Sequence, residues 1–160
     1  MLFAVSCLAL VACRDGTAGG ASTPPPTAVA GTFDRTIDLA DGPALRLVLQ
    51  DVYDPAVPGT ATTRTSERLV AARLAFTNLG DNPAPVMLAA AMQALDEEGA
   101  TYRASAAAVE GCPPPGATDV VQSGDTRTGC AVFSIPTGRA LAALRFTDPG
   151  APSSSVEWRL

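Results

Sequence analysis

The sequence predicts one all-β sandwich domain behind an export signal, and two observations lead to this prediction. Beyond residue 33, apolar and polar residues alternate, and Gly, Pro and Asp interrupt the alternation repeatedly, which is typical of short strands joined by turns. Ahead of this region, a short apolar run is followed by a stretch rich in Gly, Ser, Thr and Pro. A chain of 160 residues has room for one domain beside these segments.

Composition argues against several classes of function. The net charge is −5, the basic residues are all arginines, and no basic block alternates with aromatic residues, so we expect no binding to nucleic acid. The chain has no histidine. This removes the Ser-His-Asp and Cys-His triads, histidine zinc sites and the usual general base near neutral pH. We therefore expect neither an enzyme nor a cofactor.

Residues 2–12 are apolar but too few to span a bilayer as a helix, which needs about 20 apolar residues. They fit the hydrophobic region of a signal peptide, and Leu10-Val11-Ala12-Cys13 fits the lipobox, whose cysteine thiol accepts a diacylglycerol. No basic residue precedes the run, so either the true start codon lies upstream or the signal is unusually short. We predict a lipoprotein signal peptide over residues 1–12.

Residues 13–32 are predicted to be the lipidated cysteine followed by a disordered tether, because their Gly, Ser, Thr and Pro content cannot bury a face. The alternative is a cytosolic protein with a buried N-terminal strand, in which Cys13 is a core thiol. The tether argues against it. We expect the protein at the extracytoplasmic face of the cell membrane, held there by the acyl chains on Cys13.

Two cysteines remain for the folded domain, since Cys7 leaves with the signal peptide and Cys13 carries lipid. Cys112 and Cys130 are predicted to form a disulfide, as an even pair in an exported domain usually does. A bridge of this length stabilises by about 3 kcal/mol in the chain-entropy model. The alternative, a metal held by two thiolates, is a weak site.

The domain itself, residues 33–160, is predicted to hold about seven to eight short strands. The clearest strands are those whose alternate residues are apolar: residues 44–53, 68–77, 127–135, 143–147 and 156–160. Residues 86–95 have helical propensity, but Pro85 and the Asp96-Glu97-Glu98-Gly99 turn fit a strand between loops. We predict a strand there, with a hairpin return through Tyr102. Many short strands without a long helix indicate an immunoglobulin-like β-sandwich.

Four ordered motifs resemble a known family. They are Asn78-x-Gly80-Asp81-x-Pro83, an acidic hairpin from Asp96 to Gly99 with Tyr102 after it, Ser123-Gly124-Asp125 continuing to Gly129, Phe133 and Pro136, and Leu144-x-Phe146. Together they resemble the telokin-like lipoprotein domains of unknown function from Gram-positive bacteria. Those domains are related in fold to small secreted immunoglobulin-like immunoprotective proteins. The resemblance implies an immunoglobulin-like sandwich and no established activity.

The chain departs from antibody-type domains in two respects. Cys112 and Cys130 lie too close in sequence for a bridge between the two sheets, and Trp158 is on the last strand. The disulfide is therefore predicted to be a local staple.

Three groups of residues are candidates for a site. The carboxylates of Asp96-Glu97-Glu98 and of Asp51 and Asp54 could bind calcium or form a glycosidase pair, but acidic hairpin tips are usually solvated turns, so we predict no metal site. The aromatic residues Tyr53, Tyr102 and Trp158 could line a ligand surface, although a core position is the stronger expectation. The Pro113–Gly116 loop is a contact surface or an inert loop.

The predicted function is that of a cell-surface lipoprotein whose domain binds or interacts with a partner outside the cell. The alternative is an envelope accessory protein that binds a small ligand or a metal ion for a transporter or an enzyme. A deep pocket with converging polar groups would favour the alternative, and a filled sandwich would favour the first.

Overall fold

The computed structural model describes residues 34–160, apart from residues 41, 60–62, 87, 106 and 115–118. The predicted signal peptide, Cys13 and the predicted tether lie outside the described residues. Within the described part, no helix has the length and apolar character needed to cross a membrane.

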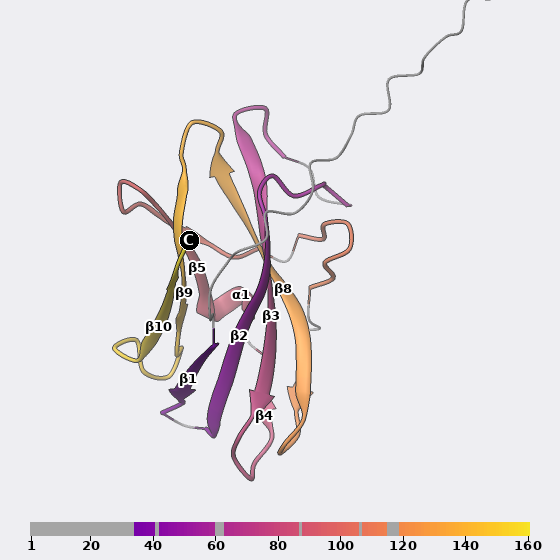
Figure 1. The fold of residues 1–160 in the computed structure, drawn as a ribbon, viewed down its shortest axis with the longest axis vertical. Coiled ribbons are helices and arrows are strands. Elements are labelled where there is room, and N and C mark those ends of the chain that lie inside the picture. The colour runs from indigo at the N-terminus through magenta and orange to yellow at the C-terminus, as the bar shows by residue number, and fades with distance from the viewer. Residues whose placement is uncertain (1–33, 41, 60–62, 87, 106, 115–118) are drawn as a thin grey trace, which may run out of the picture.

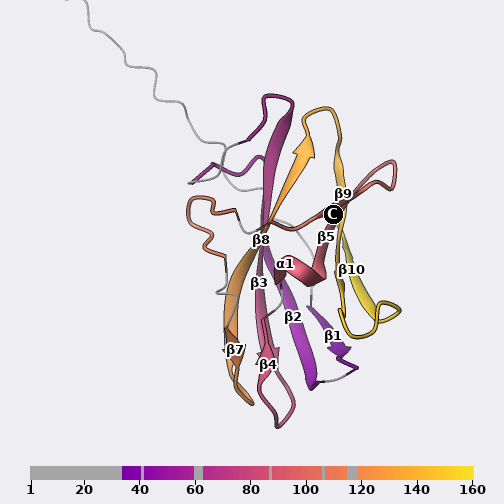
Figure 2. The same ribbon diagram turned by 180° about the vertical axis from the view of Figure 1, so that it is seen from behind.

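Two four-stranded antiparallel sheets form the domain (Figures 1 and 2), which confirms the predicted immunoglobulin-like β-sandwich. The first sheet has the order β1-β2-β3-β8 and the second the order β10-β9-β5-β6, while β4 and β7 pair as a separate ribbon. The strands are β1 (Asp34–Asp38), β2 (Ala44–Tyr53), β3 (Glu67–Asn78), β4 (Ala84–Pro85), β5 (Met92–Asp96), β6 (Thr101–Arg103), β7 (Val120–Val121), β8 (Thr126–Pro136), β9 (Leu141–Thr147) and β10 (Ser155–Arg159).

The predicted strand over residues 86–95 is wrong in its first half. One helical turn, α1 (Leu88–Ala91), comes first, and β5 begins only at Met92. The sequence of α1 is Leu-Ala-Ala-Ala, and these are among the strongest helix formers. The turn lies where the chain leaves the β4–β7 ribbon and enters the second sheet (Figure 1), so local propensity prevails at a point where no sheet partner competes with it.

Strand β2 shows how the alternating pattern builds the core. Leu45, Leu47 and Leu49 are buried between the sheets, as their spacing predicts. The register of β2 against β3 shifts between Leu49 and Asp51, so the strand contains a β-bulge at this point.

Strands β3 and β8 form the longest pairing and are buried on both faces. Their inward side chains join the main core between the sheets, which includes Val70, Leu74, Phe133, Ile135 and Trp158. Their outward side chains Leu69, Ala71 and Val132 are also buried, in a second apolar cluster. A sheet that is apolar on both faces needs a cover on its outer side.

Asn78, at the end of β3, is a fully buried polar residue. Its Nδ2 donates to the carbonyl oxygens of Asn82 (2.7 Å) and Val121 (2.9 Å), and its Oδ1 accepts from the amide of Gly80 (2.9 Å). Asn78 therefore holds the β3–β4 turn against β7. A Cβ at residue 80 would overlap Pro43, which explains the glycine in this motif.

Asp148, just after β9, is a second buried polar residue. Its Oδ1 accepts from the amide of Gly150 (2.9 Å), and its Oδ2 accepts from the amide of Ala40 (2.7 Å). The carboxylate thereby joins the β9–β10 turn to the segment after β1, which belongs to the other sheet.

We predict that Asn78→Ala lowers the free energy of unfolding by about 2–4 kcal/mol, because the buried carbonyl of Val121 and the partly buried amide of Gly80 lose their hydrogen bonds to this side chain. Chemical denaturation measures the change. Leu79→Ala is the matched control: its side chain is 54% exposed, so a change within about 0.5 kcal/mol is expected. Equal effects from the two variants would contradict the role assigned to Asn78.

Candidate functional site

Six polar side chains gather at the end of the sandwich where β8 passes into β9, and we call them the polar cluster. They come from both sheets and the turns beside them: Asp54, Arg68, Asp96, Glu98, Tyr102 and Arg139. Hydrogen bonds and ion pairs join these side chains to one another, so their geometry decides what chemistry this end of the molecule can do.

Asp96 lies at the centre of the β5–β6 hairpin and is only 3% exposed. Its Oδ1 accepts from the amides of Glu98 (3.0 Å) and Ala100 (2.8 Å), and its Oδ2 accepts from the hydroxyl of Tyr102 (2.8 Å). Gly99 completes this turn with a φ of 82°, which favours glycine. The expectation that the hairpin carboxylates are merely solvated is thus wrong for Asp96, because its side chain folds back under the turn.

The hydrogen bonds determine the protonation state of Asp96. Burial by itself raises the pKa of a carboxyl, but the bonds from Tyr102, Ala100 and Glu98, with the nearby charge of Arg139, hold the pKa of Asp96 below its ordinary value. The same bond to Asp96, together with burial, raises the pKa of the Tyr102 phenol. Asp96 is therefore ionised at neutral pH, and Tyr102 keeps its proton.

Arg68 and Arg139 complete the polar cluster. Arg68 makes a two-point ion pair with Asp54 (Nε to Oδ1 2.6 Å, Nη2 to Oδ2 2.9 Å). Its Nη1 also donates to the carbonyl oxygens of Pro136 (2.9 Å) and Arg139 (2.8 Å). The Arg139 side chain pairs with Glu98 on the β5–β6 hairpin. The cluster consequently ties the first sheet, the β8–β9 turn and the hairpin of the second sheet together.

This arrangement fits a structural role, which is to hold the end of the sandwich together, better than it fits a catalytic role. A general base near neutral pH needs a raised carboxyl pKa, and a phenolate nucleophile needs a lowered one. Asp96 and Tyr102 are shifted in the opposite directions. Their hydrogen bonds are already made within the protein, so the cluster holds the end of the sandwich in one conformation.

The other candidate carboxylates do not converge on one site. Asp51 pairs with Arg73 (3.2 Å), whereas Asp54 pairs with Arg68 in the polar cluster. Among the described residues, no group of three or more His, Cys, Asp or Glu side chains is placed to hold a metal ion.

The three candidate aromatic residues also lie apart. Trp158 is fully buried in the main core, and the Tyr102 ring packs against that core while its hydroxyl reaches Asp96. Tyr53 is on the outer side of the first sheet, where the Arg73 guanidinium lies 5.3 Å from its ring centre. No shared aromatic surface is formed by these three side chains.

The outer side of β3 and β8 is covered by two chain segments, residues 54–59 and the described residues of 105–112 (all but 106), which we call the outer cover. Backbone hydrogen bonds join the two segments at Gly59 to Ala108 (3.1 Å) and at Glu110 to Val57 (3.1 Å). Beneath them lies the second apolar cluster, made of Ala56, Leu69, Ala71, Val109, Cys112, Cys130 and Val132. The outer cover thus supplies the layer that the two-faced strands require.

Cys112 and Cys130 are joined by a disulfide in the structure, with 5.5 Å between their Cα atoms and a sequence separation of 18. The bond attaches the end of the outer cover to β8, within the first sheet and its cover. Pro113, next to it, is exposed, while Pro115 and Gly116 of the candidate loop lie outside the described residues.

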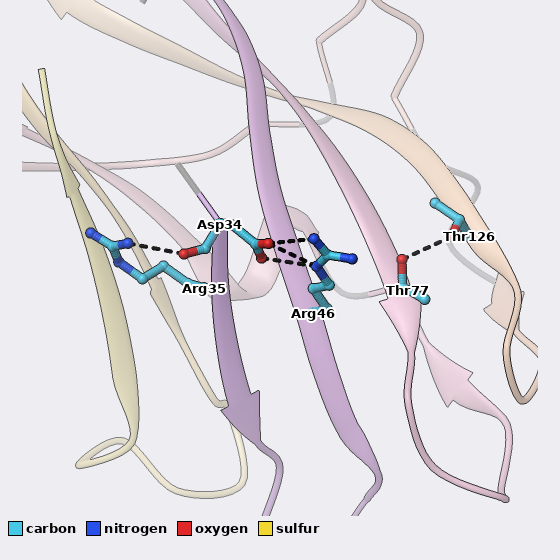
Figure 3. Close-up of polar contacts among 5 residues, drawn as sticks. All are labelled: Asp34, Arg35, Arg46, Thr77 and Thr126. Carbon is cyan, nitrogen blue, oxygen red and sulfur yellow. Dashed lines mark hydrogen bonds and ion pairs between the residues drawn. The ribbon is translucent and has the colours of Figure 1, made fainter. Parts of the chain in front are cut away.

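Elsewhere on the outer face of the first sheet, polar side chains pair across neighbouring strands (Figure 3). Arg46 on β2 pairs with Asp34 on β1 (Nε to Oδ2 2.9 Å), and Thr77 on β3 is hydrogen-bonded to Thr126 on β8 (2.8 Å). Arg35 turns away from this pair and donates to the carbonyl oxygen of Asp34 (2.9 Å). The carboxylate of Asp34 therefore has an arginine beside it, as does that of Asp51.

Among the described residues, the space between the sheets is filled by buried apolar side chains. An apolar gap near the end opposite the polar cluster has a volume of about 10 Å³, which is room for roughly one water molecule. Its lining is Leu39, Leu45, Phe76, Pro85, Val86, Val121 and Phe146. This gap is far too small for a metabolite.

Known proteins that resemble this chain share its fold, and they do not establish its function. No family model matches the chain, and no curated protein matches it. The secreted protein MPT63 of Mycobacterium tuberculosis is similar in structure, with a TM-score of 0.60, 14% identity, and 81% of this chain and 95% of that chain covered. A functionally unknown protein of Listeria monocytogenes has a TM-score of 0.52 at 13% identity, covering 84% and 88% of the two chains.

The putative lipoprotein YcdA of Bacillus subtilis is also similar, with a TM-score of 0.59 and 14% identity. The match covers 81% of this chain but 38% of YcdA, so this domain corresponds to a part of that protein. At these levels of identity the similarities show a shared fold.

We predict that replacing both Cys112 and Cys130 by Ala lowers the free energy of unfolding by about 3 kcal/mol, since the loop between them is no longer closed in the unfolded chain. Hydrogen exchange should accelerate most at the amides of the outer cover, such as Gly59 and Glu110. Ser134→Ala, an exposed change on β8, is the control and should alter stability by at most about 0.5 kcal/mol. Unchanged amide hydrogen exchange in the outer cover of the double variant would contradict the prediction that the disulfide holds this segment on β8.

We predict that Asp96→Asn lowers the melting temperature at neutral pH. The melting temperature of the variant should also change less with pH in the acid range than that of wild type. A carboxyl with a lowered folded pKa stabilises the protein above its unfolded pKa, here 3.8, and this stabilisation is lost as the pH falls through the folded value. The difference in melting temperature between wild type and variant should therefore become smaller below pH 3.8. Melting curves from pH 2 to 7 test this.

The exposed neighbour Glu97 provides the control for this comparison. Glu97→Gln should leave the melting temperature at neutral pH close to that of wild type. A gap between wild type and Asp96→Asn that stays constant down to pH 2 would contradict the assignment of the lowered pKa to Asp96.

Proposed function

We propose that this protein is exported, is anchored in the membrane through lipid on Cys13, and acts by presenting the surface of its sandwich to a partner outside the cell. The observation that carries the proposal is that the buried polar and charged side chains are engaged in internal contacts, as at Asn78, Asp96 and Asp148. With the interior filled, the outer faces are what the domain offers to other molecules. The accessory role for a small ligand would need a pocket larger than the gap beside Phe146.

Several sequence features support export and anchoring. The lipobox ends at Cys13, the segment after it has the composition of a tether, and the domain carries a disulfide, which is typical of oxidising compartments. We infer on the same grounds that the chain belongs with the telokin-like lipoprotein domains that its motifs resemble. The similarity in fold to a secreted protein and to a putative lipoprotein is in line with this inference.

We predict that Cys13→Ala abolishes stable membrane attachment, because the thiol that accepts the diacylglycerol is gone. The variant should appear in the medium or persist as an unprocessed precursor, as cell fractionation and mass spectrometry of the product would reveal. Cys7→Ala is the matched control: it removes a cysteine upstream of the cleavage site and should leave anchoring intact. A Cys13→Ala protein of mature size in the membrane fraction would rule out the lipobox.

A further inference from the structure

The outer face of the second sheet collects arginines from three different strands. Glu157, Arg145, Gln93 and Arg103 lie in register across β10, β9, β5 and β6. The next row begins with Arg159 on β10, opposite Ala143 on β9. Residues in register point to the same side of a sheet, and the alternate row, with Trp158 and Leu144, faces the core. Arg103, Arg145 and Arg159 therefore share one outer face, which we call the basic face.

The basic face is positively charged although the whole chain has a net charge of −5. Glu157 balances part of the charge, since it accepts from Arg145 (2.8 Å) and lies 3.5 Å from Arg159. Arg103 is exposed, and no ion pair to it occurs within the described residues. By contrast, the arginines on the outer face of the first sheet are each matched by an aspartate, as in Arg46–Asp34 and Arg73–Asp51.

We propose that the basic face docks on the anionic lipid surface of the membrane to which Cys13 attaches the protein, an inference that rests on the proposed anchoring. Charge complementarity is the first argument. Arginine binds lipid phosphate groups through two parallel hydrogen bonds. At physiological salt the Debye length is about 8 Å, whereas stacked sheets lie about 10 Å apart, so the acidic groups on the far sheet are screened from the bilayer.

The position of the chain entry is the second argument. β1 lies beside β10 in both views of the fold (Figures 1 and 2), and β1 begins at Asp34. The chain from Cys13 to Asp34 spans at most roughly 70 Å. The anchor thus attaches at the edge of the sandwich next to the second sheet, within reach of a bilayer on which the basic face lies flat.

The test uses the ¹⁵N-labelled mature chain from residue 14, which retains every described residue but has no lipid. It is mixed with phosphatidylcholine vesicles, with or without phosphatidylglycerol, that carry a gadolinium-chelating lipid. We expect paramagnetic relaxation only with the anionic vesicles, strongest at amides of β6, β9 and β10 and weakest at β2 and β3. Arg103→Gln should lower the bound fraction about fivefold, whereas Arg127→Gln, an exposed arginine of the first sheet, should leave it unchanged.

Equal relaxation with both vesicle types, relaxation centred on β2 and β3, or equal loss from the two arginine variants would overturn the proposal. Release by millimolar inorganic phosphate at constant ionic strength would instead indicate a discrete anion site and would also overturn it. Because the chain in this assay carries no lipid, its outcome is independent of whether Cys13 is the anchor.

Discussion

The long antiparallel pairing of β3 with β8 places apolar side chains on both faces of the first sheet, and much of the remaining architecture answers that arrangement. The inner face is covered by the second sheet, around Trp158 and Phe133. In the part of the chain that the structure describes, the outer face is covered by two loop segments that hydrogen-bond to each other, and the disulfide attaches one of them to β8. The bond between Cys112 and Cys130 thus fastens the outer cover to the strand that it covers.

The three buried polar residues share one hydrogen-bond pattern. Asn78, Asp96 and Asp148 each stand at or just after the end of a strand, and the Oδ1 of each accepts from the amide two residues further on. Each also makes a second bond to another segment, at Val121, Tyr102 and Ala40 respectively. A short polar side chain therefore ends the strand, shapes the turn and fixes that turn to a neighbour, which is how this small domain satisfies polar groups at both ends of its core.

The sequence predicts the strands well where alternation is strong, as in residues 44–53, whose bounds match β2. It fails where the deciding contact is not local. Residues 88–91 lack a sheet partner, which the chain itself does not reveal, and Asp96 reads as a surface turn because its bond to Tyr102 depends on the hairpin closing. The basic face cannot be predicted from the sequence for the same reason. Its arginines are isolated in the sequence and meet only when β10, β9, β5 and β6 are placed in that order.

The bulge in β2 decides which layer of the protein its last residues serve. If the alternation continued unbroken through β2, Tyr53 would lie on the same face as Leu49. The extra residue at Gln50 reverses the faces of the residues after it. Val52 therefore enters the main core, and Tyr53 faces the outer cover beside Arg73. The number of residues at this point, and not their type, therefore decides on which face of the sheet the following residues lie. Two related chains that differ by a single residue here would expose different side chains beyond it, so an alignment of such domains is meaningful only when it places a gap at this position.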